Sequence, residues 1–456
     1  MLKGTVTFET FDKNGKLIQR ETAENMVTDA VDKILAMSPW WDDQVTKHLP
    51  LAQNLLGGLY LFDSQLTESR ANYHLPGNAK ITGIGGRLTD LTDPKRGTLD
   101  GTLTGPIENG YKNVWKFTEN QANGYIGSVS LTSKEAGAGM LFNFIGSYNP
   151  QRYMGKMNRL PAYGYFTGYQ YNVVPLLYDD ENEEIYYGIY DGLSTLTIYK
   201  RELHLYNFGV NDGGNPGNID LVYPAETIGT LTNVSGMDSR HCCNGFDGYM
   251  YYCNASTGSS GLYFANMQRL NLNALKTGTV TFESLGEKQF TMPSGGQYKY
   301  VMNNGYIYIT TGGYQDVVRR FSIADPSSYV DYTPENEVDV KTSIETTNKL
   351  YSLHNGLVAE TLTSSDYSND FSTILHYPDG KSVKVTNGCA YSEPTDMDIY
   401  DMDLIRLWRY GSQNGFQVSP LQEYLGTIFN LPSRIHKEPT MTMTVTYTLT
   451  NVTENS

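Results

Sequence analysis

Short runs of alternating apolar and polar residues, separated by polar turns, make up most of the chain. Residues 441–450 (MTMTVTYTLT) alternate most strictly, with Thr at every second position. Period-two alternation is typical of a strand with one buried face. Residues 5–9 (TVTFE) alternate in the same way and precede Asn14 and Gly15, a strong hairpin-turn signal. Because a lone strand is not stable, the sequence predicts that the two chain ends pair in one β-sandwich.

One segment has a helical period instead. In residues 25–37 (NMVTDAVDKILAM) the apolar residues recur at the spacing of one helix face. Asn25 or Thr28 is a suitable N-cap, because either side chain can accept from the first free backbone N–H groups. The sequence therefore predicts one short helix, whose apolar stripe covers the sandwich.

The middle of the chain repeats a strand-turn-strand unit. In residues 303–328, β-forming residues 306–309 lead to a turn at Gly312 and Gly313, and residues 317–323 run back. Similar pairs occupy residues 179–203, 244–272 and 354–380. The first strands lie roughly 50 to 65 residues apart, which is slightly long for the propeller period of about 40–50. The alternative is a β-rich domain without repeats.

We therefore expect an all-β fold, with a β-propeller of about five blades (range four to seven) inserted into a β-sandwich built from both chain ends. Residues 1–146 form the N-terminal part of the sandwich domain with one helix, residues 147–410 the propeller-like domain, and residues 411–456 the strands that complete the sandwich. Close chain termini make such an insertion easy.

Composition and charge limit the classes of partner that we expect the protein to bind. The 36 Tyr and 45 Gly residues suit many short strands and tight turns. A net charge of −15 without a basic run argues against nucleic acid and anionic membrane surfaces as partners. Residues 1–15 lack the apolar core of a signal peptide, and no apolar run reaches the ~18 residues of a membrane span. We expect synthesis in a cytosol and no membrane insertion.

The cysteines indicate neither a disulfide scaffold nor a zinc site. Their number is small for the length of the chain, and their spacing matches no zinc pattern. The residues are Cys242, Cys243, Cys253 and Cys389. Free, mostly buried thiols are the expectation.

Two acidic segments are candidates for Ca²⁺, which takes several oxygen ligands. The first is the turn at residues 179–184 (DDENEE), for which a solvated run is the simpler interpretation. The second has D-x-D spacing, which puts two carboxylates on one strand face, but it lacks the EF-hand frame. Its candidate metal ligands are Asp396, Asp398, Asp401 and Asp403.

Tyrosines on the repeated strands are candidates for ligand binding. Neighbouring strand residues face opposite ways, so some rings should be exposed, where they can stack on sugars or anchor protein contacts. The alternative is that they pack between blades. The candidates are Tyr186, Tyr190, Tyr251 and Tyr306.

No catalytic motif accompanies these residues. The Asp-box of sialidase-type propellers, the G-x-S-x-G elbow, H-E-x-x-H and the phosphate-binding P-loop are all absent. Carboxylates are abundant, but no particular pair is indicated as an acid and base. We therefore expect no enzymatic activity.

Several phrases resemble tail proteins of bacteriophages that infect Gram-positive bacteria. They are residues 11–30 (FDKNGKLIQRETAENMVTDA), 57–68 (GGLYLFDSQLTE), 113–137 (NVWKFTENQANGYIGSVSLTSKEAG) and 424–450 (YLGTIFNLPSRIHKEPTMTMTVTYTLT). All lie in the terminal regions and leave the middle uncovered. The resemblance implies a structural protein of the virion, assembled in the host cytoplasm, and supplies no binding residue.

The function expected on this basis is that of a tail-tip, baseplate or fibre protein whose propeller mediates host attachment. Its expected partners are other virion proteins, further copies of itself in a homo-oligomer, and a bacterial surface polysaccharide or protein. One alternative is a purely structural collar, baseplate or head-decoration protein that contacts only virion proteins. Another is a glycan-degrading propeller enzyme.

Overall fold

The protein is described from a computed structural model. It describes residues 2–37, 55–86, 89, 91–134, 136, 158–161, 173–202, 225–234, 242–258, 261–292, 298–311, 317–334, 345–364, 371–387, 397–410, 415–421 and 423–451. These residues form seven β-sheets and few helices, so the expected all-β class is confirmed. Neither α-helix in these ranges is long and apolar enough to cross a membrane.

Strands from both chain ends share one sheet, whose order is β2-β1-β32-β8-β6 with β7 beside β8. Its strands are β1 (Leu2–Phe11), β2 (Leu17–Glu24), β6 (Thr98–Leu99), β7 (Gly105–Ile107), β8 (Gly110–Phe117) and β32 (Thr442–Asn451). β1 and β32 are antiparallel from the Leu2–Asn451 pair to the Phe11–Thr442 pair. The predicted pairing of the first and last strands is thus confirmed, and Val445 and Tyr447 of β32 lie in the core.

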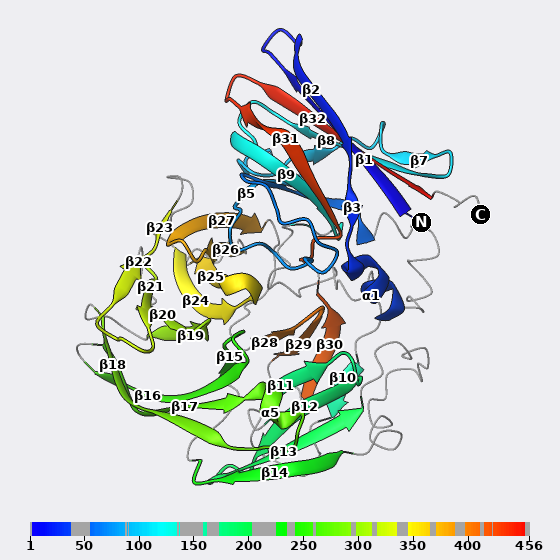
Figure 1. Cartoon of the computed structure of the whole chain (residues 1–456). Coiled ribbons are helices and arrows are strands. Elements are labelled where there is room, and N and C mark those ends of the chain that lie inside the picture. The colour runs from blue at the N-terminus through cyan, green and yellow to red at the C-terminus, as the bar shows by residue number, and fades with distance from the viewer. Residues whose placement is uncertain are drawn as a thin grey trace.

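A second sheet, of order β3-β31-β9-β4-β5, packs against the first. Its strands are β3 (Met26–Val27), β4 (Gly58–Phe62), β5 (Ile81–Gly85), β9 (Gly124–Thr132) and β31 (Thr427–Lys437). Phe8 of the first sheet stacks on Phe429 of the second, with ring centres 6.3 Å apart. Both sheets lie at the top of Figure 1.

The predicted helix begins later than expected, as α1 (Asp29–Met37). Residues 26–27 form β3, because Met26 pairs with Ile428 of β31. Neither proposed cap acts as one: Asn25 donates its side-chain N–H to the Tyr447 hydroxyl, and the Thr28 hydroxyl donates to the Leu425 carbonyl. Tertiary contacts therefore override the helical period over residues 25–28. A second, short helix, α5 (Leu272–Leu275), was not predicted.

Five further sheets occupy the middle of the chain, and four of them consist of strands consecutive in sequence. The first contains β11 (Val173–Asp179), β12 (Glu184–Tyr190), β13 (Thr195–Glu202) and β14 (Glu226–Thr232). The second contains β15 (Cys242–Asn244), β16 (Tyr249–Gly258), β17 (Gly261–Asn271) and β18 (Phe282–Thr291). The third contains β19 (Lys299–Asn303), β20 (Tyr306–Thr310), β21 (Arg319–Ser322) and β22 (Tyr329–Asp331).

The fourth and fifth sheets each contain one strand out of the simple order. The fourth contains β23 (Thr333–Pro334), β24 (Glu345–Ser352), β25 (Val358–Ser364), β26 (Phe371–His376) and β27 (Lys381–Asn387), with β23 parallel to β27. The fifth contains β28 (Met397–Met402), β29 (Ile405–Tyr410), β30 (Gly415–Pro420) and β10 (Asn158–Pro161). β10 comes from far earlier in the chain and pairs with β30.

The five sheets follow one another around a common centre in the lower part of the molecule (Figure 1). The innermost strands are β11, β15, β19, β24 and β28. β19 lies beside both β15 and β24, and β11 lies beside β28. Apolar side chains of neighbouring sheets pack face to face, as between the first and second sheets and between the second and third. The four first strands predicted from the repeat correspond to β12, β16, β20 and β25, each of which pairs with the innermost strand of its sheet.

The third sheet shows how local sequence sets this arrangement. Asn304 and Gly305 both adopt positive φ, as a tight two-residue hairpin turn requires, and they join β19 to β20. Ile307 of β20 faces Phe321 of β21, so the predicted antiparallel pairing of the two strands is confirmed. Gly312 and Gly313 of the predicted turn lie outside the described residues. Ile307 is fully buried against the second sheet, whereas the neighbouring Tyr306 is 39% exposed.

Replacing Ile307 with Asp should therefore unfold this sheet, because it buries an unpaired carboxylate at a cost of several kcal/mol. We expect a clear drop in Tm by calorimetry. The matched control is Tyr306→Asp, on the exposed face of the same strand, which should leave Tm nearly unchanged. Equal effects of the two changes would contradict the assigned register.

Candidate functional site: the polar cavity between the two sheet groups

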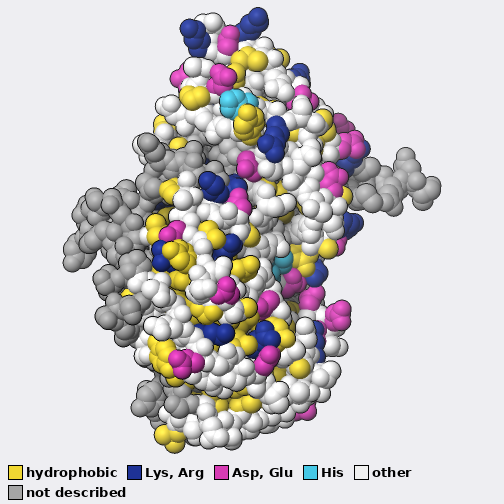
Figure 2. Space-filling model, turned by 60° about the vertical axis from the view of Figure 1, so that its left-hand side comes forward, with side chains coloured by type: hydrophobic (Ala, Val, Ile, Leu, Met, Phe, Trp, Pro, Cys, Tyr) yellow, Lys and Arg dark blue, Asp and Glu magenta, His cyan; other side chains and the backbone are white. Residues whose placement is uncertain are grey.

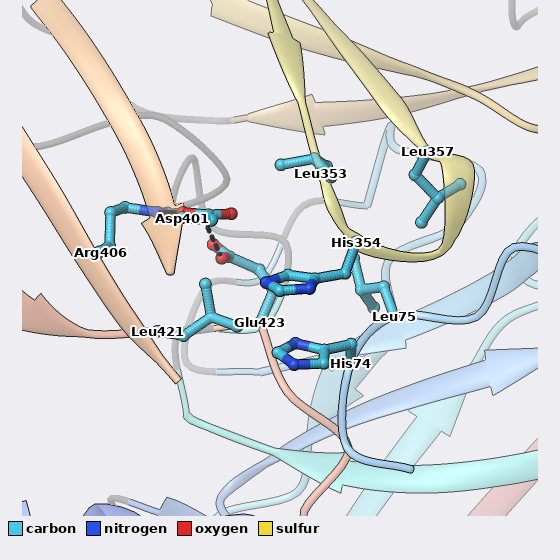
Figure 3. A pocket seen from close by; sticks show the side chains of 9 residues that line it. All are labelled: His74, Leu75, Leu353, His354, Leu357, Asp401, Arg406, Leu421 and Glu423. Carbon is cyan, nitrogen blue, oxygen red and sulfur yellow. Dashed lines mark hydrogen bonds and ion pairs between the residues drawn. The ribbon is translucent and has the colours of Figure 1, made fainter. Parts of the chain in front are cut away.

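A small polar cavity lies where loops of the terminal sheets contact turns of the middle sheets (Figure 3). Its volume is about 20 Å³, enough for roughly one water molecule. The lining side chains come from four segments far apart in sequence. They are His74, Leu75, Leu353, His354, Leu357, Asp401, Arg406, Leu421 and Glu423.

Two stacked imidazoles form one wall of the cavity. His74, from the loop between β4 and β5, lies parallel to His354, with ring centres 3.6 Å apart and planes 10° apart. His354 begins the short 3₁₀ turn between β24 and β25, and Phe246 packs edge-on against its other side. Burial and the neighbouring His74 lower the pKa of His354 well below its usual value, so this ring is neutral. His74 Nδ1 and His354 Nε2 have no hydrogen-bond partner.

A buried ion cluster forms the opposite wall. Arg406 of β29 donates from Nε to Asp401 Oδ1 at 2.5 Å and from Nη2 to Glu423 Oε2 at 3.0 Å. All three side chains are almost fully buried. One guanidinium cannot neutralise two carboxylates, and burial raises the pKa of Glu423 to about 7, although Arg406 lowers it. Glu423 Oε1 is unpartnered and can carry that proton.

Asp403 connects the same turn to the N-terminal segments. Its carboxylate accepts from the Tyr73 hydroxyl at 2.9 Å and lies 3.2 Å from His74 Nε2 and 3.5 Å from Lys33 Nζ. Lys33, on α1, also pairs with Asp180 at 2.9 Å. Burial alone would raise the pKa of Asp403, but His74, Lys33 and Tyr73 together hold it far below its usual value.

The arrangement can bind a water molecule and exchange a proton near neutral pH. A sugar ring does not fit in 20 Å³. The stacked geometry also suits a shared metal poorly, because the lone pairs of parallel imidazoles do not converge. No group of three or more potential metal ligands occurs in the described part of the chain.

Of the four predicted metal ligands, the two whose side chains the structure describes have different partners. Asp401 pairs with Arg406, and Asp403 contacts Lys33, Tyr73 and His74. Asp396 and the side chain of Asp398 lie outside the described residues. In the other acidic turn, Asp179 pairs with Lys276 at 3.0 Å. Ca²⁺ binding by Asp396, Asp398, Asp401 and Asp403 stays a prediction.

Of the four candidate tyrosines, Tyr306 offers an exposed ring, with the Arg320 guanidinium 4.7 Å from its centre. Tyr186, Tyr190 and Tyr251 are buried in or between sheets. Their hydroxyls bond to Glu184, the Leu193 carbonyl and Asp247, respectively. Cys242, Cys243 and Cys253 are not in a disulfide, and Cys389 lies outside the described residues.

Sequence reasoning missed the cavity because its parts are distant in the chain. His74 and His354 are 280 positions apart and share no motif. Arg406 and Glu423 also have no spacing that signals an ion pair. The signal that did exist was the acidic 396–403 segment, in which Asp401 and Asp403 form ion pairs with Arg406 and Lys33.

Comparisons with known proteins found a distant structural similarity and no sequence match. No protein-family model and no curated protein matches the chain. Among solved structures, the chain is similar to a GH43 glycoside hydrolase whose active site was engineered to display both endo-xylanase and exo-arabinofuranosidase activity. The match has 10% identity and a TM-score of 0.25, and it covers 67% of this chain and 59% of that one.

This match corrects one expectation. The sequence led us to expect no enzymatic activity, whereas the similar solved structure is that of an enzyme. We therefore no longer exclude an enzymatic role. At this TM-score the likeness assigns no substrate and no catalytic residue to this chain.

Glu423→Gln should change how stability depends on pH. A carboxyl whose pKa is raised on folding stabilises the fold fully below its unfolded value of about 4.5, and this contribution disappears as pH rises through about 7. The wild type should lose about 2–3 kcal/mol from this group between pH 5 and 8, and the variant should not. Urea denaturation at several pH values measures the slope of the free energy of unfolding against pH for both proteins.

The exposed Glu438→Gln is the control for this change and should keep the wild-type slope. Identical slopes in the wild type and Glu423→Gln would show that Glu423 is already ionised in the folded state.

Asp403→Asn should weaken the junction. Asn tolerates the positive φ of 52° at this position but lacks the charge that holds Lys33. We expect a loss of about 1–3 kcal/mol at pH 7. Because a lowered carboxyl pKa stabilises the fold above about pH 4 and ceases to do so in acid, the difference should shrink on acidification.

The control is Asp32→Asn on α1, whose side chain is largely exposed and pairs with Arg70. Its free energy of unfolding should match that of the wild type within about 0.5 kcal/mol. A loss as large as that of Asp403→Asn would assign the effect to net charge instead of the junction.

Proposed function

We propose that the five middle sheets form a five-bladed β-propeller and that the two terminal sheets form a β-sandwich on which it stands. The support is the strand order within each sheet and the innermost position of β11, β15, β19, β24 and β28. β10 would close the ring, because it supplies the outer strand of the sheet that ends the repeat. Closure of this kind removes the weak point at which a ring of sheets would open.

The sandwich side of this propeller is closed. The turns between first and second strands contact N-terminal residues at three blades: Asp180 pairs with Lys33, Asn355 donates to the Leu75 carbonyl, and Asp403 binds Tyr73. The stack of His74 on His354 lies in the same layer. The turns between second and third strands lie at the other end, where Leu193 is 79% exposed and Val317 is also exposed.

We infer from this that a ligand approaches the end remote from the sandwich, and we propose a polysaccharide of the host surface as that ligand. The observation that carries the proposal is the closed junction, whose 20 Å³ cavity leaves no room for a sugar. The resemblance of the terminal segments to phage tail proteins supports attachment of the sandwich to other virion proteins. The proposed role is host-surface recognition by a tail component.

The test is a pull-down of host-wall polysaccharide by the full chain, with reducing ends measured in the same sample. We expect retention of polysaccharide by the wild type. Leu193→Glu and Val317→Glu together should reduce it at least about tenfold, because they place charges where apolar contact is needed. Leu103→Glu, at an exposed position in the turn before β7, is the matched control.

Retention that falls in the double variant and persists in Leu103→Glu supports the proposal. New reducing ends under the same conditions would make the recognition site a hydrolytic one. Absence of retention by the wild type, or retention unchanged by the double variant, overturns the proposal.

A further inference from the structure

An exposed tyrosine on the terminal sheets lies between two basic side chains. Tyr125 of β9 is 53% exposed, and its cross-strand partner is His436 of β31. The two rings stack with centres 4.6 Å apart, and Arg434 Cζ lies 5.9 Å from the centre of the Tyr125 ring. The register of β31 shifts between Asn430 and Ile435, and such irregularities re-aim side chains.

Arg434 differs from three other arginines that lie over tyrosines of the described strands. Arg269 lies over Tyr249 and pairs with Glu283 through two nitrogens. Arg319 lies over Tyr329 and pairs with Asp331 in the same way. Arg320, over Tyr306, donates to the Pro378 carbonyl. Arg434 has no carboxylate or carbonyl partner within the described residues and is exposed.

The positive charge of Arg434 beside Tyr125 contrasts with the negative net charge of the chain. The net charge is −15, and basic and acidic side chains are interspersed over the face in Figure 2. An aromatic ring flanked by a free guanidinium and an imidazole favours a ligand with an apolar ring face and an anionic group.

We propose that Tyr125, Arg434 and His436 form a binding site for an acidic sugar residue. The CH face of the sugar stacks on the exposed Tyr125 ring, and its carboxylate accepts from the Arg434 guanidinium. His436 holds the tyrosine ring in place, and its ring N–H donates to the same carboxylate. The site lies on the terminal sheets and does not depend on the proposed recognition at the far end of the propeller.

The test is calorimetric titration of the full chain with tri-galacturonic acid, with a neutral galactose trisaccharide and with inorganic phosphate. We expect the acidic trisaccharide to bind more tightly than either of the others, and its affinity to fall with added salt. Arg434→Gln and Tyr125→Ala should each weaken binding by about tenfold. Thermal unfolding of each variant checks that it is folded.

Tyr329→Ala is the matched control, since it removes an equally exposed tyrosine whose arginine is already neutralised by Asp331. Binding should be unchanged in this variant. Equal affinity for the neutral trisaccharide overturns the charged contact, and equal affinity for phosphate overturns the role of the sugar ring. Unchanged binding in Arg434→Gln overturns the site. Retention of host-wall polysaccharide by the double variant Leu193→Glu and Val317→Glu bears only on the recognition proposed for the propeller.

Discussion

The antiparallel pairing of β1 with β32 constrains everything between them. It joins residues 2–11 to residues 442–451 without a register break, so the chain must return to the place where it began. The interior side chains on these strands, among them Phe8, Val445 and Tyr447, are fully buried. The proposed ring of five middle sheets satisfies this constraint, because a chain that runs around a ring ends near the point where it began. The pairing of β10 with β30 is a second contact of this kind, because it joins residues 158–161 to residues 415–418.

Charge and burial then fix how the two sheet groups meet. Lys33, Asp180, Asp403 and Tyr73 form a partly buried network, in which each charge has an opposite partner at hydrogen-bond distance. In the same layer, Arg406 is shared by Asp401 and Glu423, which line the cavity of about 20 Å³. Buried polar groups cost free energy when unpaired, so this layer selects one orientation of the two groups. In the proposed function, a ligand therefore binds at another surface.

The parts of the structure that the sequence predicted are those set by local periodicity. Alternation identified β1 and β32, and the repeat identified β12, β16, β20 and β25. The start of α1 was misplaced because Asn25 and Thr28 bond to residues about 400 positions away, which no local pattern records. The cavity could not be predicted for the same reason: His74, His354 and Glu423 meet only through tertiary packing. The expectation of no enzymatic activity rested on absent motifs, and absence of a motif is weak evidence.

Hydrogen–deuterium exchange of the full chain, with and without host-wall polysaccharide, tests the central claim most directly. The account predicts slower exchange in peptides that contain Leu193 and Val317, at the end of the proposed propeller remote from the terminal sheets. Exchange around Asp403 and Glu423 should stay unchanged, because the junction is already closed in the free protein. Protection confined to the junction, with none at Leu193 and Val317, would contradict the account.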